Sequence, residues 1–354
     1  MKVVYQSFLG RFSDSPRALF ERLRERPDTE HVWLLDPAHE AAFPDDVTTV
    51  RIDGPEAREA LESADLVVAG THTEVEWTKP AGSVYLQTWH GTPLKRIHND
   101  VLLVPPGRLA ELDRDIARWD VLLSPNPFST PRLRQAFAYD GPIWETGLPR
   151  NDLLLGPDAS TTRCAVRREL GLADDETAVL YAPTWRDDEK YAGVAEVPMH
   201  LHLGAVAERL TASGRRHRVL ARVHNLMTDR SHAEAAPGVV DVSLYPDVNE
   251  LYLAADVLVT DYSSVMFDFA LTGRPMVFYA YDLDRFRDEI RGFYFDLLPV
   301  APGPVVLTED ELVDALVRLD QGPYAERYEA FRTTYGGLED GHSTDRVLER
   351  LGLP

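Results

Sequence analysis

Short apolar runs alternate with helical patterns along almost the whole chain, and this alternation restricts the fold more than any other feature. The first half carries strand-like runs at 3–5, 32–35, 66–68, 84–86, 121–123 and 143–144, and the second half at 179–181, 219–220, 239–240, 257–259 and 276–278. Strands that alternate with helices form parallel sheets covered on both faces. The sequence therefore predicts an α/β fold with two Rossmann-like domains that face a cleft.

A polar stretch rich in Gly, Pro, Asp, Ser and Thr follows residue 156 and is typical of a linker. We expect an N-terminal domain at 1–155, a C-terminal domain at 156–335 and a helical tail at 336–354. A linker at 156–162 would allow the two domains to close on a ligand.

The composition excludes several classes of protein. The 354 residues carry a formal net charge of −21, which argues against nucleic acid as a partner and against broad adhesion to anionic lipid. Cys164 is the single cysteine, so an internal disulfide is excluded, and we expect a bystander thiol. No apolar stretch of about 18 residues occurs, and the first residues resemble a strand rather than a signal peptide. These features favour a cytoplasmic protein, although a local patch could still touch a membrane.

The segment from Asp261 to Asp268 (DYSSVMFD) follows an apolar strand and opens a short helix that should end at Gly273. A strand, a turn with Ser263 and Ser264, and a helix place free backbone N–H groups at the carboxyl edge of the sheet. The helix dipole makes this position attractive to an anion such as a diphosphate. An ordinary helix cap would carry the same residue types.

His90 ends a strand, Gly91 allows a tight turn, and Thr92-Pro93 is a favourable helix start. A histidine at this place points into the predicted cleft, where it could act as a general base. The alternative is a histidine that only hydrogen-bonds a turn.

Three more groups of polar residues belong to the second half. Thr184 and Arg186 follow a strand, and Arg186 could bind a phosphate oxygen or pair with Asp187 and Asp188. Arg222 and His224 lie on one side of an extended segment, where they could bind an anion together or line a solvated edge. Glu250 could accept ribose hydroxyls, although first helical turns favour Glu anyway.

Metal binding is not predicted. His72, in the segment 71–73 (THT), and the pair His200 and His202 are weak metal candidates, because no third ligand has convincing spacing. No P-loop and no GxSxG elbow is present.

Together these motifs resemble the CDP-glycerol glycerophosphotransferases of teichoic acid and capsule synthesis, and the resemblance covers nearly the whole chain. The motifs that carry it occur in one order, which makes the match specific. They are VYQSF at 4–8, SDSPRAL at 13–19, QTWHGTPLKR at 87–96, SPN at 124–126, ETGLPRND at 145–152, APTWRD at 182–187, NELY at 249–252, TDYSSVMFD at 260–268, RGFYF at 291–295 and LEDG at 338–341.

The resemblance implies a GT-B architecture, with an acceptor-side N-terminal domain and a CDP-donor-binding C-terminal domain. It implies transfer of glycerol phosphate from CDP-glycerol to a hydroxyl of a lipid-linked acceptor, with release of CMP and no tightly bound cofactor. His90 would be the general base, and His224 would act with Arg222 on the phosphates. The other residues that it places near the donor are Thr184, Arg186, Asp261, Ser263, Ser264 and Asp268, with Arg274 and Pro275 near the cytosine.

The chain departs from the family pattern in two places. It lacks the long N-terminal extension of the large polymerases, which puts repeated addition in doubt. It carries His342 where a Lys often stands, so a charge at that position would depend on pH.

A lipid-linked acceptor implies work at the inner face of the cell membrane, as a peripheral protein. The run 101–106 (VLLVPP), beside Lys95 and Arg96, is a candidate contact site, and a buried strand or helix end is the alternative. Three alternative functions remain at this point: a CDP-ribitol transferase, a GT-B glycosyltransferase that uses a nucleotide sugar, and an inactive nucleotide-binding scaffold.

Overall fold

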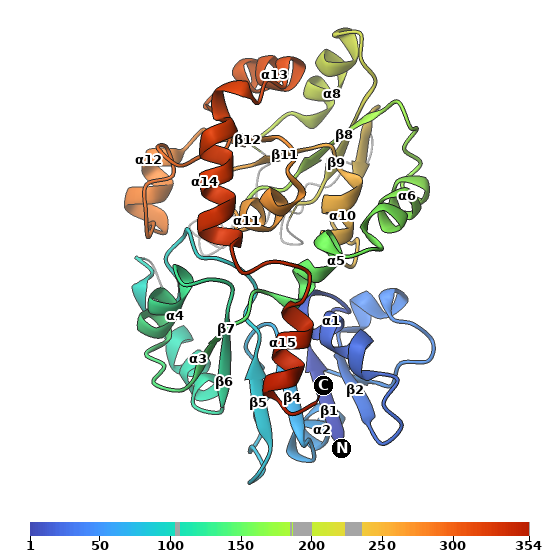
Figure 1. The fold of residues 1–354 in the computed structure, drawn as a ribbon, viewed down its shortest axis with the longest axis vertical. Coiled ribbons are helices and arrows are strands. Elements are labelled where there is room, and N and C mark those ends of the chain that lie inside the picture. The colour runs from blue at the N-terminus through green and yellow to red at the C-terminus, as the bar shows by residue number, and fades with distance from the viewer. Residues whose placement is uncertain (103–106, 185, 187–199, 224–235, 354) are drawn as a thin grey trace.

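The chain folds into two lobes, each built on one parallel sheet (Figure 1). The structure is a computed structural model and describes residues 1–102, 107–184, 186, 200–223 and 236–353. The sheet of the first lobe has seven strands in the order β3 (Thr49–Arg51), β2 (Glu30–Leu35), β1 (Lys2–Gln6), β4 (Leu66–Ala69), β5 (Val84–Gln87), β6 (Val121–Ser124) and β7 (Ile143–Glu145). The sheet of the second lobe has six, in the order β10 (Val239–Asp241), β9 (His217–Ala221), β8 (Thr177–Tyr181), β11 (Val257–Thr260), β12 (Met276–Tyr279) and β13 (Val305–Val306).

Both sheets are doubly wound, because the strand order reverses between β1 and β4 in the first and between β8 and β11 in the second. The predicted fold class is confirmed, and every predicted strand is present. Two further strands, β3 and β13, were not predicted, and they are edge strands of three and two residues. β3 holds a single apolar residue, Val50, and the two residues of β13 are too few to show an alternation.

Helices cover the faces of both sheets (Figure 1). Those of the first lobe are α1 (Asp14–Leu23), α2 (Pro55–Glu62), α3 (Arg108–Ile116), α4 (Ser129–Phe137) and, from the far end of the chain, α15 (Ser343–Arg350). Those of the second lobe and the crossing are α5 (Asp152–Leu155), α6 (Ala159–Glu169), α8 (Leu203–Ala212), α10 (Val248–Ala254), α11 (Val265–Phe269), α12 (Leu283–Arg285), α13 (Glu309–Arg318) and α14 (Ala325–Gly336). Short turns of other helix types are η1 (Pro37–Ala42), η2 (His98–Asp100), η3 (Pro149–Asn151), η4 (Ala270–Thr272), η5 (Phe286–Ile290) and η6 (Gly322–Tyr324).

The expected linker at 156–162 is wrong for most of its length, because α6 begins at Ala159. The weak helix formers at its start are overridden by tertiary contacts. Arg163 and Arg167 of α6 donate hydrogen bonds to the last carbonyls of α10 and form ion pairs with Asp256. The first crossing between the lobes lies instead at residues 146–155, through η3 and α5.

The chain crosses back to the first lobe after α14 (Figure 1). Val347 and Leu348 of α15 are buried in the same apolar cluster as Val3 and Leu19 of the first lobe. The two crossings lie side by side, since Asp152 accepts hydrogen bonds from the backbone N–H groups of Ser343 and Thr344, at 2.8 and 2.7 Å. No helix within the described residues is long and apolar enough to cross a bilayer.

Candidate active site between the lobes

The carboxyl ends of both sheets meet at the space between the lobes. In doubly wound sheets a crevice opens at the point where the strand order reverses. In the second lobe a hydrogen bond spans this point. The Thr184 backbone N–H, which follows β8, donates to Oδ1 of Asp261, which follows β11, at 2.8 Å. Opposite them, in the first lobe, lies the loop that carries His90 after β5. Two of the predicted strand-end residues, Thr184 and Asp261, therefore lie side by side.

His90 is held in the form that a general base requires. Its Nδ1 lies 2.8 Å from the Gly70 carbonyl oxygen, and because a carbonyl only accepts, Nδ1 carries the proton and Nε2 keeps its lone pair. Within the described residues, no hydrogen bond occupies Nε2. The rings of Trp89 and Phe8 lie 4.0 and 5.3 Å from the imidazole and restrict its orientation.

Burial lowers the pKa of His90 below its usual value, against the Gly70 hydrogen bond and the Asp14 charge, which raise it. The charges of Arg150 and Lys95 lower the pKa further. His90 is therefore neutral near pH 7, as a proton acceptor must be.

Gly91 brings this loop against the turn of the second lobe that contains Ser263 and Ser264, here called the serine turn. Its φ is +148°, and a Cβ there would lie 3.1 Å from Ser264 Oγ and 3.2 Å from Ser264 Cβ. Ser263 and Ser264 are half-buried, and neither hydroxyl has a hydrogen-bond partner among the described residues. The Ser264 hydroxyl, at the start of α11, thus lies against the loop that carries His90.

We expect Gly91→Ala to lower kcat/KM about 10- to 100-fold, because a displacement of about 1 Å between reacting groups can cost a factor of 10². The added methyl group would push the His90 loop away from Ser264. Gly82→Ala is the matched control, since Gly82 also has a positive φ, +88°, but nothing would lie within 4 Å of a Cβ at that position. The measurement is kcat/KM from steady-state kinetics. A similar loss of kcat/KM in both variants would show that backbone strain causes the effect and would contradict the close approach to Ser264 as its cause.

Arg150 was not singled out from the sequence, and it lies at the centre of the contact between the lobes. Its Nη1 donates to Asp14 Oδ2 at 2.6 Å, and its Nη2 donates to Asp268 Oδ2 at 2.6 Å and to the His90 carbonyl at 2.9 Å. All three charged side chains are buried. A single cation therefore ties α1, the His90 loop and α11 together.

Asp268, a predicted donor-binding residue, uses its second oxygen as well, because Oδ1 accepts from Asn151 Nδ2 at 3.0 Å. Asp268 therefore lies in the contact between the lobes, in α11, four residues after Ser264.

Arg186 and Asp261 are brought to the site but engage each other. Arg186 Nη1 lies 2.9 Å from Asp261 Oδ2, and its Nε lies 2.7 Å from Asp282 Oδ2. The guanidinium is buried, and the faces of three aromatic rings surround it, those of Tyr262, Tyr281 and Phe286. This pairing shapes the turn after β11. The alternative partners weighed from the sequence, Asp187 and Asp188, lie outside the described residues.

Arg222 extends the site along β9. It donates to the carbonyls of Val242 and Tyr245, and burial lowers its pKa to about 10. The positive charge of Arg11, from the first lobe, is the second cause of this lowered pKa, so two cations from opposite lobes lie near each other. Mutual repulsion of this kind is relieved by an anion between them. His224 lies outside the described residues.

Glu250 joins the two lobes at one side of the cleft. Its Oε1 accepts from Arg17 Nη1 of α1 at 2.8 Å, and its Oε2 accepts from the Tyr245 hydroxyl at 2.9 Å. Both oxygens are thus engaged within the protein. Ribose binding by Glu250 stays a prediction.

Arg274 and Pro275 are not brought to the site. They precede β12 and so lie at the amino edge of the second sheet, opposite to Ser264. Arg274 Nη1 donates to the carbonyls of Tyr252, Leu253 and Ala255 at the end of α10. A cation at a helix C-terminus is a stabilising contact. A helix-capping contact accounts for this arginine, and a cytosine contact has no support in its position.

Of the histidines weighed as weak metal ligands, His72 lies near the site: burial lowers its pKa to about 3, and the charges of His98 and His90 contribute. His202 is exposed and its Nδ1 lies 2.9 Å from Glu309 Oε1. In the described part of the chain no group of three or more His, Cys, Asp or Glu side chains is placed to hold a metal ion.

Glu339 is a buried acid in the joint between the lobes. Burial raises its pKa to about 8, against hydrogen bonds from Asn151 Nδ2 and the Leu148 N–H, which lower it. The folded state thus keeps a proton that an unfolded glutamate, with a usual pKa of 4.5, has lost. The stabilisation from Glu339 is complete below about pH 4.5 and is lost as the pH rises through about 8.

We therefore expect the free energy of unfolding to fall between pH 5 and pH 8 with a contribution of at most about 1.4 kcal/mol per pH unit from this group. Urea unfolding across this range should show a flatter dependence for Glu339→Gln. Glu329→Gln, at an exposed ion pair with Arg332, is the control and should keep the wild-type slope. An unchanged slope in Glu339→Gln would show that Glu339 is ionised in the folded protein.

Comparison with known proteins identifies the family. A sequence model described as CDP-glycerol:poly(glycerophosphate) glycerophosphotransferase matches residues 1–353. This chain belongs to that family. The family predicted from the motifs is thus confirmed, and with it an enzyme of the glycerophosphotransferase type.

Relatives in this family align over nearly the whole chain. The teichoic acid glycerol-phosphate transferase of Staphylococcus aureus is 37% identical over 99% of this chain and 92% of its own length. The teichoic acid poly(glycerol phosphate) polymerase of Bacillus subtilis is 34% identical over 99% of this chain, which spans only 48% of that relative. A ribitol-phosphate primase of Bacillus spizizenii is 28% identical and aligns with 75% of this chain.

A solved structure of the wall teichoic acid polymerase TagF, a variant soaked with CDPG, superposes with a TM-score of 0.87 at 33% identity. The match covers 99% of this chain and 88% of that one. The two-lobed architecture is therefore that of the glycerophosphotransferase family.

Proposed function

We propose that this chain transfers glycerol phosphate from CDP-glycerol to a hydroxyl of a teichoic acid-type acceptor and releases CMP. The observation that carries the proposal is His90, whose Nε2 has no hydrogen-bond partner among the described residues and belongs to a loop packed against the serine turn of the opposite lobe. The family membership supplies the reaction class.

In this mechanism His90 Nε2 takes the proton of the acceptor hydroxyl as its oxygen attacks the phosphorus that carries glycerol. A new P–O bond forms, the P–O bond to the CMP phosphate breaks, and CMP leaves with the electron pair. The Ser263 and Ser264 hydroxyls and the start of α11 would bind the phosphate oxygens of the donor. Arg222, with Arg11 near it, would compensate charge, as phosphoryl transfer requires. We assign His224 to the same charge-stabilising role, on the family motif alone, and we expect no tightly bound cofactor.

The choice of donor decides between this proposal and its alternatives. The glycerol-phosphate relatives align over 98–99% of this chain at 34–37% identity, which favours CDP-glycerol over CDP-ribitol. The test is to incubate the purified protein with CDP-glycerol, CDP-ribitol and UDP-sugars, with and without a glycerol-phosphate acceptor, and to measure CMP or UDP. We expect acceptor-dependent CMP release with CDP-glycerol. Binding without release under all conditions would favour a scaffold, and UDP release would favour a glycosyltransferase.

We further propose that the acceptor is lipid-linked and that the protein contacts the inner face of the cell membrane. Two exposed leucines support a local apolar contact, Leu102 at 46% and Leu298 at 44% of full exposure. Residues 103–106 of the predicted contact run lie outside the described residues. Liposome flotation that is insensitive to salt and unchanged by Leu102→Asp would reject a contact through this run.

A further inference from the structure

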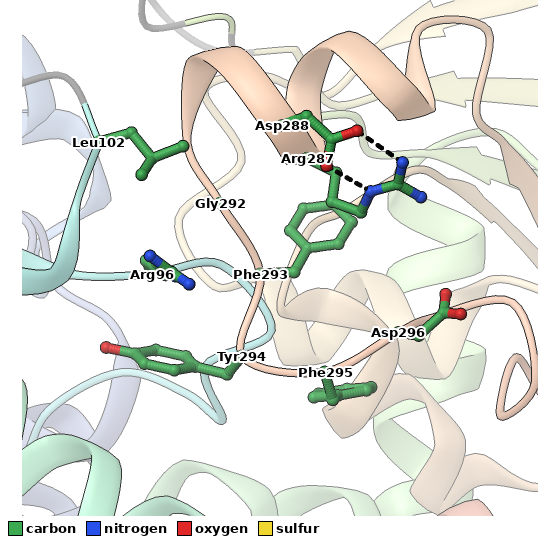
Figure 2. A pocket seen from close by; sticks show the side chains of 9 residues that line it. All are labelled: Arg96, Leu102, Arg287, Asp288, Gly292, Phe293, Tyr294, Phe295 and Asp296. Carbon is green, nitrogen blue, oxygen red and sulfur yellow. Dashed lines mark hydrogen bonds and ion pairs between the residues drawn. The ribbon is translucent and has the colours of Figure 1, made fainter.

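A cavity of about 540 Å³ opens between the lobes on the β12 side of the cleft (Figure 2). Its first-lobe wall is made by Arg96 and Leu102, and its second-lobe wall by residues 287–288 and 292–296, which follow β12. Arg222 and β9 lie on the other side of β11 in the sheet order. The cavity and Arg222 therefore lie on opposite sides of the serine turn that follows β11.

The backbone fixes Arg96 at this cavity. The Arg96 N–H donates to the Gly292 carbonyl at 2.9 Å, and the Tyr294 N–H donates to the Leu94 carbonyl at 2.8 Å, so a short antiparallel bridge joins the lobes. Gly292 has a φ of +79°, and a Cβ there would lie 2.8 Å from Arg96 Cδ. The arginine side chain thus lies in the space that a bare glycine leaves.

Arg96 differs from the other cation of the cavity in its pairing. Arg287 lies against Asp288, with Nη2 and Oδ2 at 2.6 Å, and also pairs with Asp284 (Figure 2). Arg96 has no carboxylate partner among the described residues. In a chain with 58 acidic and 37 basic side chains, an arginine without a carboxylate at a cavity wall is available for an anionic ligand.

The remaining walls favour a ligand with short aliphatic parts. The side chains of Phe293, Tyr294 and Phe295 lie around the cavity together with Leu102 (Figure 2). The Tyr294 hydroxyl is already bound to Asp100 Oδ2 at 2.6 Å, so this ring offers its face rather than a donor. Asp296, exposed at the rim, could accept hydrogen bonds from hydroxyl groups. A phosphodiester between small polyols has the negative charge, the short carbon chains and the hydroxyl groups that these walls would bind.

The segment that forms the first-lobe wall of the cavity also reaches the reacting centre, through Lys95, which precedes Arg96 in the chain. The charge of Lys95 acts on the pKa of His90, and its Nζ lies 3.4 Å from Thr184 Oγ1 in the second lobe. A chain that enters along the cavity would therefore reach His90 from the side opposite to Arg222.

We propose that this cavity is the acceptor subsite, in which Arg96 binds a phosphodiester of the incoming glycerol-phosphate chain and the aromatic wall packs against its glyceryl carbons. This assignment rests on the proposed function. It makes Arg96 a determinant of acceptor affinity and leaves the donor to the serine turn and the β9 side.

The kinetic test uses the full chain, CDP-glycerol and a soluble glycerol-phosphate oligomer as acceptor. We expect Arg96→Ala to raise the KM for the oligomer about 10-fold or more, as the loss of a charge-assisted hydrogen bond predicts, with the KM for CDP-glycerol changed less than about twofold. Arg96→Lys should restore part of the affinity. Arg114→Ala, at an exposed arginine 3.7 Å from Glu76, is the control and should match the wild type. An unchanged acceptor KM, or an equal rise in both KM values, would overturn the assignment.

A binding measurement separates this inference from the proposed function. Diglyceryl phosphodiester is titrated calorimetrically into the wild type and Arg96→Ala without CDP-glycerol. Heat with the wild type that is lost in Arg96→Ala supports the subsite even if no donor releases CMP, in which case the proposed function alone has failed. No binding to the wild type, or equal binding to both proteins, overturns the subsite whatever the turnover.

Discussion

His90→Ala should lose turnover by about 10²- to 10⁴-fold, the usual effect of removing a general base. Donor affinity should be largely kept, because Ser263, Ser264 and Arg222, which we assign to the donor, lie in the opposite lobe. Turnover is measured as CMP release and affinity as CDP-glycerol binding. His202→Ala is the matched control, since His202 is exposed and pairs only with Glu309 among the described residues, and it should keep wild-type turnover.

The pH dependence gives a second readout on the same residue. His90 must be neutral to accept a proton, and burial lowers its pKa. The acid limb of kcat/KM should therefore lie below about pH 6.5, the usual pKa of histidine, and kcat/KM should be lost as the pH falls through it. A loss of CDP-glycerol binding in His90→Ala equal to the loss of turnover would contradict the assignment as base.

Arg150→Met should lower the free energy of unfolding by about 3–5 kcal/mol, because it leaves two buried carboxylates without their cation. The variant should also lose turnover, since the His90 carbonyl loses its anchor to the opposite lobe. Urea unfolding measures the first effect and CMP release the second. Arg22→Met removes an ion pair whose side chains are 64% and 54% exposed, and it should change stability by less than about 1 kcal/mol.

A second variant shows whether charge is the cause. Arg150→Met combined with Asp268→Asn should be more stable than Arg150→Met alone, because one uncompensated charge is gone. If the double variant is no more stable, the loss comes from packing rather than from buried charge.

The fold and part of the site could be predicted because both depend on local signals. Buried parallel strands are continuous apolar runs, and the residue that follows each strand is at the ligand-binding edge. His90 and Ser264 follow from this rule and face each other. Helix α14 was missed, although Tyr328, Phe331 and Tyr335 share one face at helical spacing and are buried. That periodicity was the signal that could have found it.

The rest depends on contacts between residues that are distant in the sequence. Arg150 stands in a Pro-Arg-Asn turn, where a charged side chain is usually solvated, and its partners Asp14 and Asp268 are 136 and 118 residues away. Arg186 is likewise satisfied by Asp282, 96 residues further along the chain. Local spacing carries no information on such pairs, so the sequence alone could not separate a ligand-binding arginine from one that is already paired.

The side-by-side crossings at Asp152 and Ser343 have a mechanical consequence. The two adjacent chain connections, joined by a seam of hydrogen bonds, form a hinge. The lobes can rotate about this hinge, but neither lobe can slide along it or separate from it. Any opening that admits a nucleotide must then be a rotation about this seam, with the largest travel at the rim farthest from it. Residues at that rim would gain and lose contacts with each turnover, while residues beside the seam would keep their contacts.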